Sequence, residues 1–236
     1  MLIGIVGLKR SGKDTVANYL IKNYNFAKIS AAEPIKDIAR IIFPHWDESI
    51  IETNKKDEIE PITGIIPRDL FKWIGTDIFQ FSIYDKFPQL QNYIPPRNMW
   101  VNIMEQKYKK LINEDKNVIV PDIRFVHEAE FIIRNNGKLI YLDKFDINEN
   151  SNLDYQLNEL IFNNNYFNTK NNENYNKHNI ETINNKNNKN NKDNKDNKYK
   201  KYNENEKMKW IDYTISNKNT IHDLYKECDK LIKIIY

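Results

Sequence analysis

Near the N-terminus lies a short glycine-containing loop whose residue types and spacing could bind phosphate. Residues 7–13 read GLKRSGK, which matches the phosphate-loop pattern G-x-x-x-x-G-K. The two glycines let the backbone turn tightly and approach an anion, and successive N–H groups then face its oxygens. Lys13 would bridge the β- and γ-phosphates while charge develops on them. The expected nucleotide-binding residues are Gly7, Lys9, Arg10, Ser11, Gly12, Lys13, Asp14 and Thr15.

One position of this loop departs from the usual pattern and bears on a metal ion. The residue after the lysine is normally Ser or Thr, whose hydroxyl binds Mg²⁺, whereas here it is Asp14, followed by Thr15. Carboxylates hold Mg²⁺ directly or through water. We therefore expect Asp14 and a second carboxylate, Asp122, to serve Mg²⁺, in part through water. A glycine-containing turn without any ligand is the alternative.

A second pair of reactive side chains follows an apolar run further along the chain. Residues 118–120 read VIV, and Asp122 and Arg124 come shortly after them. Ligands of open α/β sheets bind at the carboxyl ends of the strands, so both side chains would face one cleft. Arg124 could hold a phosphate with two hydrogen bonds. We therefore assign catalysis to Lys13, Asp122 and Arg124, with a purely local salt bridge between the last two as the alternative.

The elements that must position these residues alternate between strands and helices. Short apolar runs predict five strands, over residues 2–6, 26–30, 118–120, 138–142 and 210–216. Helical spacing predicts six helices, over residues 16–24, 34–42, 67–79, 100–111, 127–136 and 220–235. Residues 43–67 contain turn signals and are expected to be irregular. The alternation predicts an α/β fold in three layers, with a mainly parallel five-stranded sheet flanked by helices.

Two of the predicted helices carry recognisable end signals. Gly137 follows the helix over residues 127–136 and is expected to cap it in a left-handed conformation. Thr220 precedes the last helix, with Asp223 three residues later, which is typical of an N-terminal cap. Cys228 lies on the apolar face of this helix and is expected to fill the core.

Composition narrows the class of protein further. The chain has 236 residues, of which 40% are hydrophobic and 29% are charged, as in ordinary globular domains. It contains one cysteine, so no internal disulfide and no cysteine-based zinc cluster can form, which fits a reducing compartment. It shows neither a signal peptide nor an apolar run of about 18 residues. We therefore expect a cytoplasmic protein that does not enter a membrane.

Asparagine is concentrated in one segment. Of 36 Asn residues, 19 lie within residues 163–205, together with 9 Lys and 5 acidic residues. The basic balance of the chain, +3 overall, therefore belongs to this segment. Its few apolar side chains could not offset the entropy of ordering it, so we expect it to be disordered. A charge that arises in this way gives little reason to expect a nucleic-acid partner.

Taken together, the motifs resemble the deoxynucleoside monophosphate kinases of large DNA phages and viruses. The resemblance is carried by GLKRSGKDT at 7–15, PIK at 34–36, RDLFKWIGTD at 68–77, DIRF at 122–125 with Glu128, and DYTISN at 212–217. These motifs stand in the family's order and cover most of residues 1–142 and 208–236. The resemblance implies a P-loop kinase fold in a single domain over residues 1–236. It also implies ATP with Mg²⁺ as the phosphoryl donor and a deoxynucleotide as the acceptor.

The acceptor side can be assigned on the same basis. Lys36 and Arg68 would lie on helices that line this side and could bind the acceptor phosphate, with solvated surface charge as the alternative. Trp73 and Trp100 could stack on a base, although core packing explains such residues equally well. The expected substrate-binding residues are Lys36, Arg68, Trp73, Trp100, Arg124 and Glu128.

Two departures from the family concern charge near the transferred phosphate. The family tends to have an Arg near the end of the Gly-Thr-Asp helix, where this chain has Gln80. It also has a basic lid after the fourth strand. Here the corresponding residues 143–207 start with a single basic residue, Lys144, and are then interrupted by the Asn-rich segment. Lys9 and Arg10 of the phosphate loop are the candidates to replace the missing charges.

Three functions stay open at this point. We favour a kinase that transfers the γ-phosphoryl group of ATP to a deoxynucleoside monophosphate (dNMP), giving a diphosphate and ADP. A kinase of dephospho-CoA or phosphomevalonate shares parts of the motifs. A nucleic-acid-binding protein that uses residues 163–205 is the non-enzymatic alternative. The expected partner is therefore a dNMP, without membrane or nucleic acid, and a homodimer is left open.

We predict that a short Gly/Ser linker can replace residues 163–205 without loss of the fold. Loop-closure entropy changes slowly with length, so the free energy of unfolding should change by only about 1 kcal/mol. The linker must still join Leu142 and Trp210, which we expect on neighbouring strands. Thermal unfolding of the deletion variant measures the effect. A drop in Tm of more than about 10 °C would mean that the segment packs on the core.

Overall fold

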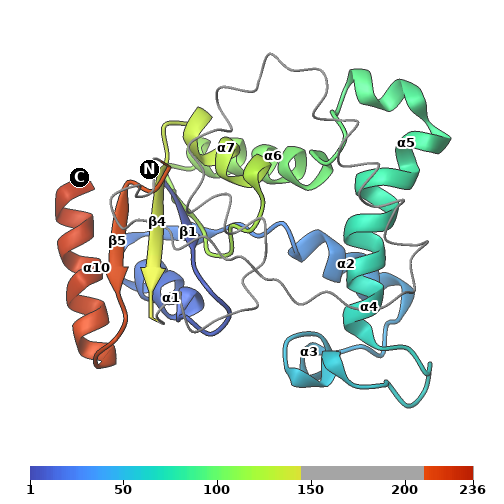
Figure 1. The fold of residues 1–236 in the computed structure, drawn as a ribbon, viewed down its shortest axis with the longest axis horizontal. Helices are drawn as coiled ribbons and strands as arrows, with labels where there is room; N and C mark the ends of the chain where they lie inside the picture. The colour runs from blue at the N-terminus through green and yellow to red at the C-terminus, as the bar shows by residue number, and fades with distance from the viewer. Residues whose placement is uncertain (145–209, 236) are drawn as a thin grey trace, which may run out of the picture.

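The computed structural model describes residues 1–144 and 210–235, and a five-stranded sheet lies at their centre (Figure 1). The strands are β1 (Leu2–Val6), β2 (Phe26–Lys28), β3 (Asn117–Val120), β4 (Lys138–Asp143) and β5 (Tyr213–Ser216). Their spatial order is β2-β3-β1-β4-β5, and all four neighbouring pairs are parallel. Parallel strands buried on both faces read as continuous apolar runs, as β1 does. The predicted α/β sheet is confirmed.

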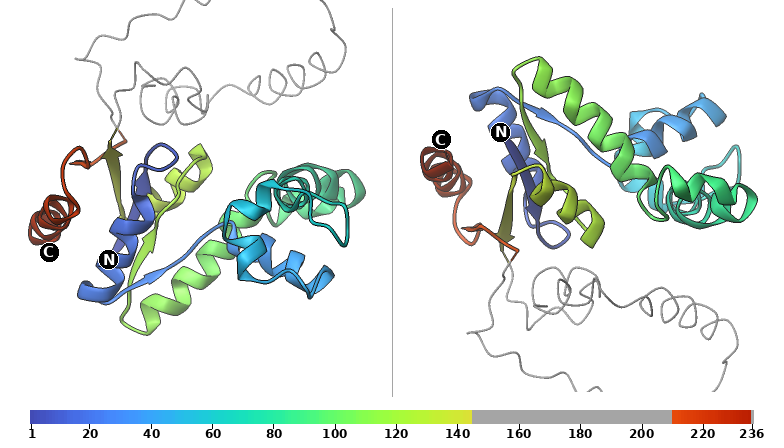
Figure 2. Two further views of the ribbon diagram at one scale, coloured as in Figure 1. Left: turned by 90° about the horizontal axis from the view of Figure 1, so that it is seen from below. Right: turned by 90° about the horizontal axis from the view of Figure 1, so that it is seen from above.

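Helices cover both faces of the sheet (Figure 2). α1 (Lys13–Tyr24) and α10 (Ile221–Ile235) pack on one face, and α6 (Met99–Asn113) and α7 (Val126–Arg134) pack on the other. Successive side chains of β1 alternate between the two layers. Ile3 and Ile5 join the cluster with α1 and α10, whereas Leu2 and Val6 join the cluster with α6 and α7.

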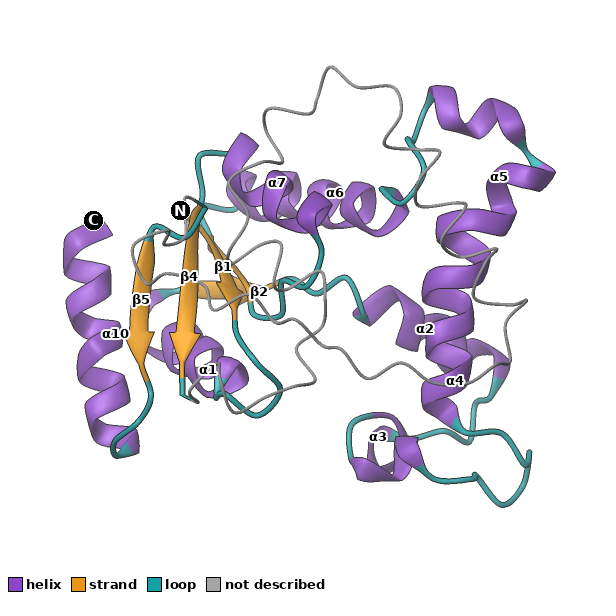
Figure 3. Ribbon diagram, viewed as in Figure 1, coloured by secondary structure: helices purple, strands orange, loops and turns teal. Residues whose placement is uncertain are grey.

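A helical region stands beside the sheet, between β2 and α6 (Figure 3). Its elements are α2 (Glu33–Ile42), α3 (Glu48–Ile51), the 3-10 helix η1 (Asn54–Asp57), α4 (Pro67–Lys72), the π-helix η2 (Trp73–Ser82), α5 (Ile83–Lys86) and the 3-10 helix η3 (Pro88–Asn92). Trp46 and Ile51 form a small core here with Ala39. The expectation that residues 43–67 are irregular was therefore partly wrong. Asp47 and Thr53 cap α3 and η1 through backbone N–H groups, a signal the sequence already contained.

The helix predicted over residues 67–79 is longer than expected. It continues from α4 through η2 into α5 and ends only at Lys86, before Pro88. Gly75 lies inside this helix, close to α2. A Cβ there would lie 2.7 Å from Ile35 Cδ1 and would displace the end of that side chain. The carbonyl of Gly75 also accepts a hydrogen bond of 2.6 Å from Trp100 Nε1 of α6. These contacts join η2 to the helices beside it.

The end of α7 differs from the sequence prediction. Asn136, not Gly137, has the left-handed backbone, with φ of 55°. Asn tolerates this conformation because its short polar side chain bonds locally. Gly137 is instead required by close packing, since a Cβ there would lie 2.7 Å from Ile132 Cγ2. The glycine therefore lets the chain pass close to the end of α7 as it enters β4.

The last helix confirms most of its predicted features. Asp223 N–H donates to Thr220 Oγ1 and the Thr220 hydroxyl donates to the Asp223 carboxylate, which forms the expected cap. Cys228 is completely buried, and burial raises the pKa of its thiol to about 12. Ile221, which helical spacing predicts on the same apolar face as Cys228, is 58% exposed at the first residue of the helix. Asp229 accepts hydrogen bonds from two tyrosines of α1 and so joins the two helices of this layer.

The two chain segments that flank the Asn-rich segment meet in the sheet. β4 and β5 pair in parallel, with Leu142 opposite Ile215, so the expectation that neighbouring strands flank the segment is confirmed. The predicted lid over residues 143–207 and the segment 163–205 lie outside the described residues, apart from the first two lid positions. Among the helices that the structure describes, none is long and apolar enough to cross a membrane.

A buried carboxylate holds the helical region together. Glu60 is 6% exposed and accepts hydrogen bonds from the backbone N–H groups of Ile62 and Thr63, from the Thr63 hydroxyl and from Trp46 Nε1. His45 Nε2 lies 3.4 Å from the same carboxylate. Burial alone would raise the pKa of Glu60, but these hydrogen bonds outweigh it and hold the pKa at about 2. The turn after Glu60 is therefore stabilised by the ionised form.

We predict that Glu60→Gln lowers Tm by about 5 °C at pH 7 and that this difference shrinks in acid. A carboxylate whose native pKa lies below its unfolded value contributes stability above the unfolded pKa. That contribution is lost as the pH falls toward the native value, here about 2. Thermal unfolding of both proteins from pH 7 to pH 3 measures the difference. A Tm difference that does not depend on pH would contradict the importance of the charge.

Candidate active site

The glycine-containing loop joins β1 to α1 at the carboxyl edge of the sheet. Gly12 precedes α1 with a left-handed φ of 99°, which favours glycine. Arg10 is also left-handed, with φ of 67°. A Cβ on Gly7 would lie 2.8 Å from Ser11 Oγ, so the tight turn needs a glycine at this position too. The loop therefore has the compact shape that the G-x-x-x-x-G-K pattern predicts.

Lys13 points back over this loop. Its Nζ donates hydrogen bonds to the carbonyl oxygens of Gly7 at 2.7 Å and Leu8 at 2.9 Å. Nζ also lies 3.5 Å from Asp122 Oδ1, and the side chain is only 11% exposed. Burial lowers the pKa of Lys13 below its usual value, while the charge of Asp122 opposes that shift. The ammonium group is thus held at the loop by groups that a phosphate could replace.

The loop also contains a hydroxyl group that lacks a partner. Ser11 is 1% exposed, and among the described residues its Oγ has no hydrogen-bond partner. A buried hydroxyl without a partner costs free energy, so an additional hydrogen-bonding group at this place would be stabilising. Together with the tight glycine turns, this orphan hydroxyl fits a loop that encloses the phosphates of a nucleotide.

A residue that the sequence assignment left out, Asn217, supports the loop from β5. Its Nδ2 donates a hydrogen bond of 2.7 Å to the carbonyl of Ser11. Its backbone N–H donates to Asp143 O at 2.7 Å, which fixes the residue after β5. A Cβ on Gly12 would lie 2.6 Å from Asn217 Nδ2, so the glycine makes room for this contact. The sequence signal was its place directly after a strand, in a motif already noted.

Asp122 and Arg124 lie beside the loop because β3 is the neighbour of β1. Gly4 of β1 is opposite Val120, and Ile123 N–H donates to Ile5 O at 3.0 Å. Asp122 Oδ2 accepts from Arg124 Nε at 2.8 Å, and Arg124 Nη2 is 2.6 Å from the same oxygen. The salt bridge considered as an alternative is present. Because Asp122 also faces Lys13, the structure brings all three predicted catalytic side chains together.

Glu128 has a supporting position in this cluster. Its Oε2 accepts hydrogen bonds from the backbone N–H groups of Arg124 at 2.8 Å and Phe125 at 3.1 Å. The side chain is 5% exposed, and burial raises its pKa to about 7 although the two N–H groups favour the ionised form. These contacts fix the backbone that carries Arg124. Direct contact of Glu128 with a substrate stays a prediction, and its observed partners favour a positioning role.

The residues suggested for Mg²⁺ are few and partly engaged. Asp14 is 78% exposed at its side chain and lies 3.2 Å from Lys28 Nζ, while Asp122 faces Lys13 and Arg124. Residues 1–144 and 210–235 contain no group of three or more potential His, Cys, Asp or Glu ligands. Mg²⁺ at kinase sites uses one or two carboxylates, waters and phosphate oxygens. The donor set therefore fits an ion that the nucleotide itself largely holds.

The two cations expected on the acceptor side are both ion-paired. Lys36 Nζ lies 2.6 Å from Glu52, and Arg68 pairs with Asp57 of η1. The hydrogen bond from Arg68 is the main cause that lowers the pKa of Asp57, and the charge of Lys9 adds to it. The Arg68–Asp57 pair therefore lies within electrostatic reach of the phosphate loop. Lys36 belongs to a separate ion-pair network on α2 and α3.

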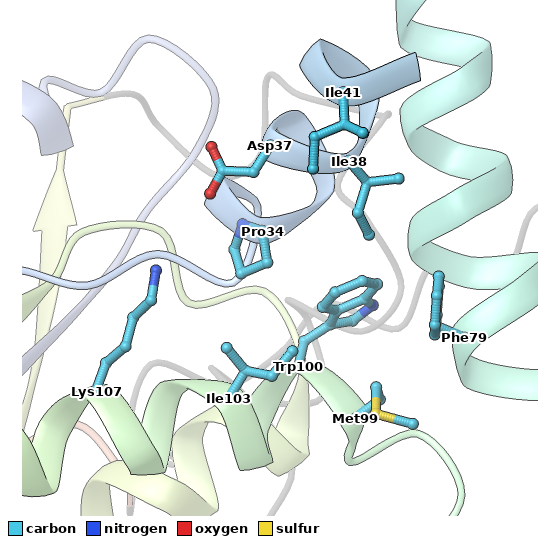
Figure 4. A pocket seen from close by; sticks show the side chains of 9 residues that line it. All are labelled: Pro34, Asp37, Ile38, Ile41, Phe79, Met99, Trp100, Ile103 and Lys107. Carbon is cyan, nitrogen blue, oxygen red and sulfur yellow. The ribbon is translucent and has the colours of Figure 1, made fainter.

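The two tryptophans have different surroundings. Trp100 is 4% exposed and lines an apolar cavity of about 280 Å³ between α2, η2 and α6, next to Phe79 (Figure 4). The carboxylate of Asp37 and the ammonium group of Lys107 lie on one side of this cavity. Trp73 is 53% exposed and does not line it. The lining includes no residue of the phosphate loop or of the loop after β3, so the cavity has no direct contact with the catalytic cluster.

The residues at the two departures from the family lie in η2 and beside the phosphate loop. Gln80 is buried in η2, and its neighbour Phe81 lies beneath the guanidinium of Arg97. Lys144 Nζ donates to the carbonyl of Arg10 at 3.3 Å, which connects the start of the predicted lid to the phosphate loop. The side chains of Lys9 and Arg10 belong to exposed residues of that loop. Their proposed part in charge stabilisation stays a prediction.

The fold and the site together define the class of protein. A parallel sheet with a phosphate loop after β1 and an acidic–basic pair after β3 is the arrangement of a P-loop kinase. The family model described as deoxynucleotide monophosphate kinase matches residues 1–64. The "Putative deoxynucleotide monophosphate kinase" of Acanthamoeba polyphaga mimivirus is 32% identical over 148 residues, which cover 61% of this chain and 74% of that protein.

The viral match is extensive enough to place the chain. It belongs to the deoxynucleotide monophosphate kinase family and is a nucleotide kinase. Among solved structures, dephospho-CoA kinase from Campylobacter jejuni is similar at 17% identity, over 99% of this chain and 96% of that one, with a TM-score of 0.41. The match to the viral protein confirms, at the level of the family, the resemblance noted in the sequence.

Proposed function

We propose that this kinase transfers the γ-phosphoryl group of ATP to a dNMP and releases ADP and the deoxynucleoside diphosphate. The observation that carries the proposal is the cluster of Lys13, Asp122 and Arg124 at the carboxyl edge of β1 and β3. Family membership supports a deoxynucleotide as the acceptor. The acceptor phosphate oxygen is already anionic, so positioning and neutralisation of charge should dominate the chemistry.

On the donor side, the phosphate loop would bind the β- and γ-phosphates. Lys13 would leave the carbonyl oxygens of Gly7 and Leu8 and donate to phosphate oxygens, on which negative charge increases during transfer. The Ser11 hydroxyl would gain the partner it lacks. Asn217 would keep the loop in shape through the carbonyl of Ser11.

On the acceptor side, Arg124 would exchange part of its contact with Asp122 for the acceptor phosphate. A planar guanidinium can hold two phosphate oxygens, and Glu128 fixes the backbone from which the side chain extends. Asp122, relieved of one cation, would then be available to a water molecule on Mg²⁺. When bound, Mg²⁺ neutralises charge on the phosphates, and Asp14 and Asp122 are the residues that would hold it.

The test is ADP formation from ATP and Mg²⁺ with each dNMP and each ribonucleoside monophosphate in turn. We expect turnover with at least one dNMP and lower kcat/KM with the matching ribonucleotide. Dephospho-CoA and phosphomevalonate belong in the same panel because they would reveal the other P-loop kinase activities. Turnover only with one of these two compounds would contradict the proposal. Cytoplasmic location and a homodimer stay predictions.

A further inference from the structure

The arginines of this chain differ in whether they have a counter-charge. The chain has six, and four of them form ion pairs with carboxylates: Arg40, Arg68, Arg124 and Arg134. Within residues 1–144 and 210–235, the other two, Arg10 and Arg97, pair with no carboxylate. Arg10 is an exposed residue of the phosphate loop, where an anion is expected. Arg97 lies outside that loop, so its lack of a carboxylate partner among the described residues needs a separate explanation.

Arg97 is held in place by its backbone and by an aromatic ring. It lies between η3 and α6 with a left-handed φ of 69°, which a non-glycine residue adopts only when the surroundings require it. Asn98 N–H closes the turn on Pro95 O at 3.0 Å. The guanidinium carbon lies 5.2 Å from the centroid of the Phe81 ring of η2, so the side chain is directed rather than free to move in solvent.

A second arginine shows that an aromatic contact does not replace a counter-charge. Arg134 lies 5.7 Å from the centroid of Phe131, and its Nη2 is also 2.6 Å from Glu105. Arg97 has the same kind of ring contact and is half-buried, yet no carboxylate of the described residues neutralises it. A partly desolvated cation without a partner costs free energy that a bound anion would recover.

Arg97 lies toward the edge of the sheet that carries the catalytic cluster. α6 begins two residues after Arg97, packs on the sheet beside α7 and leads directly into β3, so its first turn lies toward the carboxyl end of β3, which Asp122 and Arg124 follow. His127, in the first turn of α7, has its pKa lowered to about 4, mainly by burial and further by the charge of Arg97. His127 follows Arg124 by three residues and stacks on Phe125. The guanidinium therefore lies toward the loop that carries Asp122 and Arg124, as the course of α6 into β3 requires.

We propose that Arg97 binds the phosphate of the acceptor monophosphate; this rests on the proposed function. A phosphate dianion between Arg97 and Arg124 would supply the counter-charge that Arg97 lacks. It would also lie near Lys13, because Asp122 contacts both Arg124 and Lys13. The other cation near the phosphate loop on the acceptor side, Arg68, already has Asp57 as its partner. Arg97 therefore complements Arg124 from the helical region, so the acceptor phosphate would be held from two sides.

The experiment compares Arg97→Ala, Arg97→Lys and the matched control Arg134→Ala with the wild type. We expect Arg97→Ala to raise KM for the dNMP about 10- to 100-fold while KM for ATP stays unchanged. A lysine retains the charge but not the planar pair of donors, so Arg97→Lys should recover part of the loss. Arg134→Ala loses a ring-stacked arginine elsewhere and should keep both KM values.

Calorimetric titration separates phosphate binding from a general effect on the acceptor side. Wild type should bind the dNMP more tightly than the deoxynucleoside without phosphate, and Arg97→Ala should lose that difference. Unchanged KM for the dNMP, or an equal loss of affinity for both compounds, would overturn the assignment of Arg97. Absence of turnover with every dNMP overturns the proposed function instead. Binding of dNMP by wild type but not by Arg97→Ala would still support Arg97 in that case, and no binding by wild type would overturn both.

Discussion

Lys13→Ala should lower kcat by about 10²- to 10³-fold while the fold stays intact. The ammonium group lies over the phosphate loop, within hydrogen-bond distance of two loop carbonyls and 3.5 Å from Asp122. Removal of a preorganised group that meets charge in the transition state commonly costs a factor of this size. Because the side chain contacts ligand-facing groups rather than the core clusters, its truncation should leave Tm nearly unchanged. Steady-state ADP release at saturating ATP and dNMP measures the effect.

Lys22→Ala is a suitable control for this experiment. Lys22 lies on the same helix, α1, in its last turn and is exposed, so its loss should affect neither kcat nor Tm. A Lys13→Ala enzyme that kept more than about half of the wild-type turnover would refute the assignment of the phosphate loop. A large drop in Tm would instead show that Lys13 has a structural role.

Arg124→Ala should act mainly on the acceptor. A lost charge-assisted pair to phosphate costs about 1.5–3 kcal/mol, which corresponds to a rise in KM for the dNMP of roughly 10- to 150-fold. KM for ATP should stay close to the wild-type value because Lys13 and the loop backbone are retained. The loss of Arg124 also leaves Asp122 with Lys13 as its remaining close cation. Initial rates with each substrate varied in turn separate the two effects.

The Arg134→Ala variant serves as the control here as well, since Arg134 ends the same helix, α7, that begins after Arg124. An effect of Arg124→Ala on ATP instead of the dNMP would contradict our placement of the donor and acceptor nucleotides. If the affinity for ATP fell by this amount while KM for the dNMP did not change, Arg124 would belong to the donor side.

Features that depend on neighbouring residues could be predicted well. The glycines, the lysine and the flanking strand and helix of the phosphate loop lie within residues 2–24, so their pattern is complete in one stretch of chain. The cap formed by Thr220 and Asp223 is equally local. Alternation of strands and helices was enough for the parallel sheet, because a parallel connection requires a crossover helix. The resemblance of the motifs to a known family was enough to predict that the protein is a nucleotide kinase.

Features that depend on contacts between distant segments of the chain could not be predicted from the sequence. Asp122 is 109 positions from Lys13 by residue number, and only the neighbouring places of β1 and β3 bring them to 3.5 Å. Asn217 reaches the carbonyl of Ser11 because β5, which it follows, is separated from β1 only by β4. Lys36 could be named as a cation, but its partner Glu52 depends on how α3 folds back on α2.

The sequence by itself determined which groups are available for phosphate chemistry, because residue type and short-range spacing specify a loop, a strand end and a helix cap. The tertiary structure decided which charges are already neutralised. Packing brought carboxylates to Arg68, Arg124 and Arg134 and, among the described residues, none to Arg97. Coulomb interactions fall off with distance, so whether a cation is paired or available depends on the final few ångströms of packing, which no local pattern encodes.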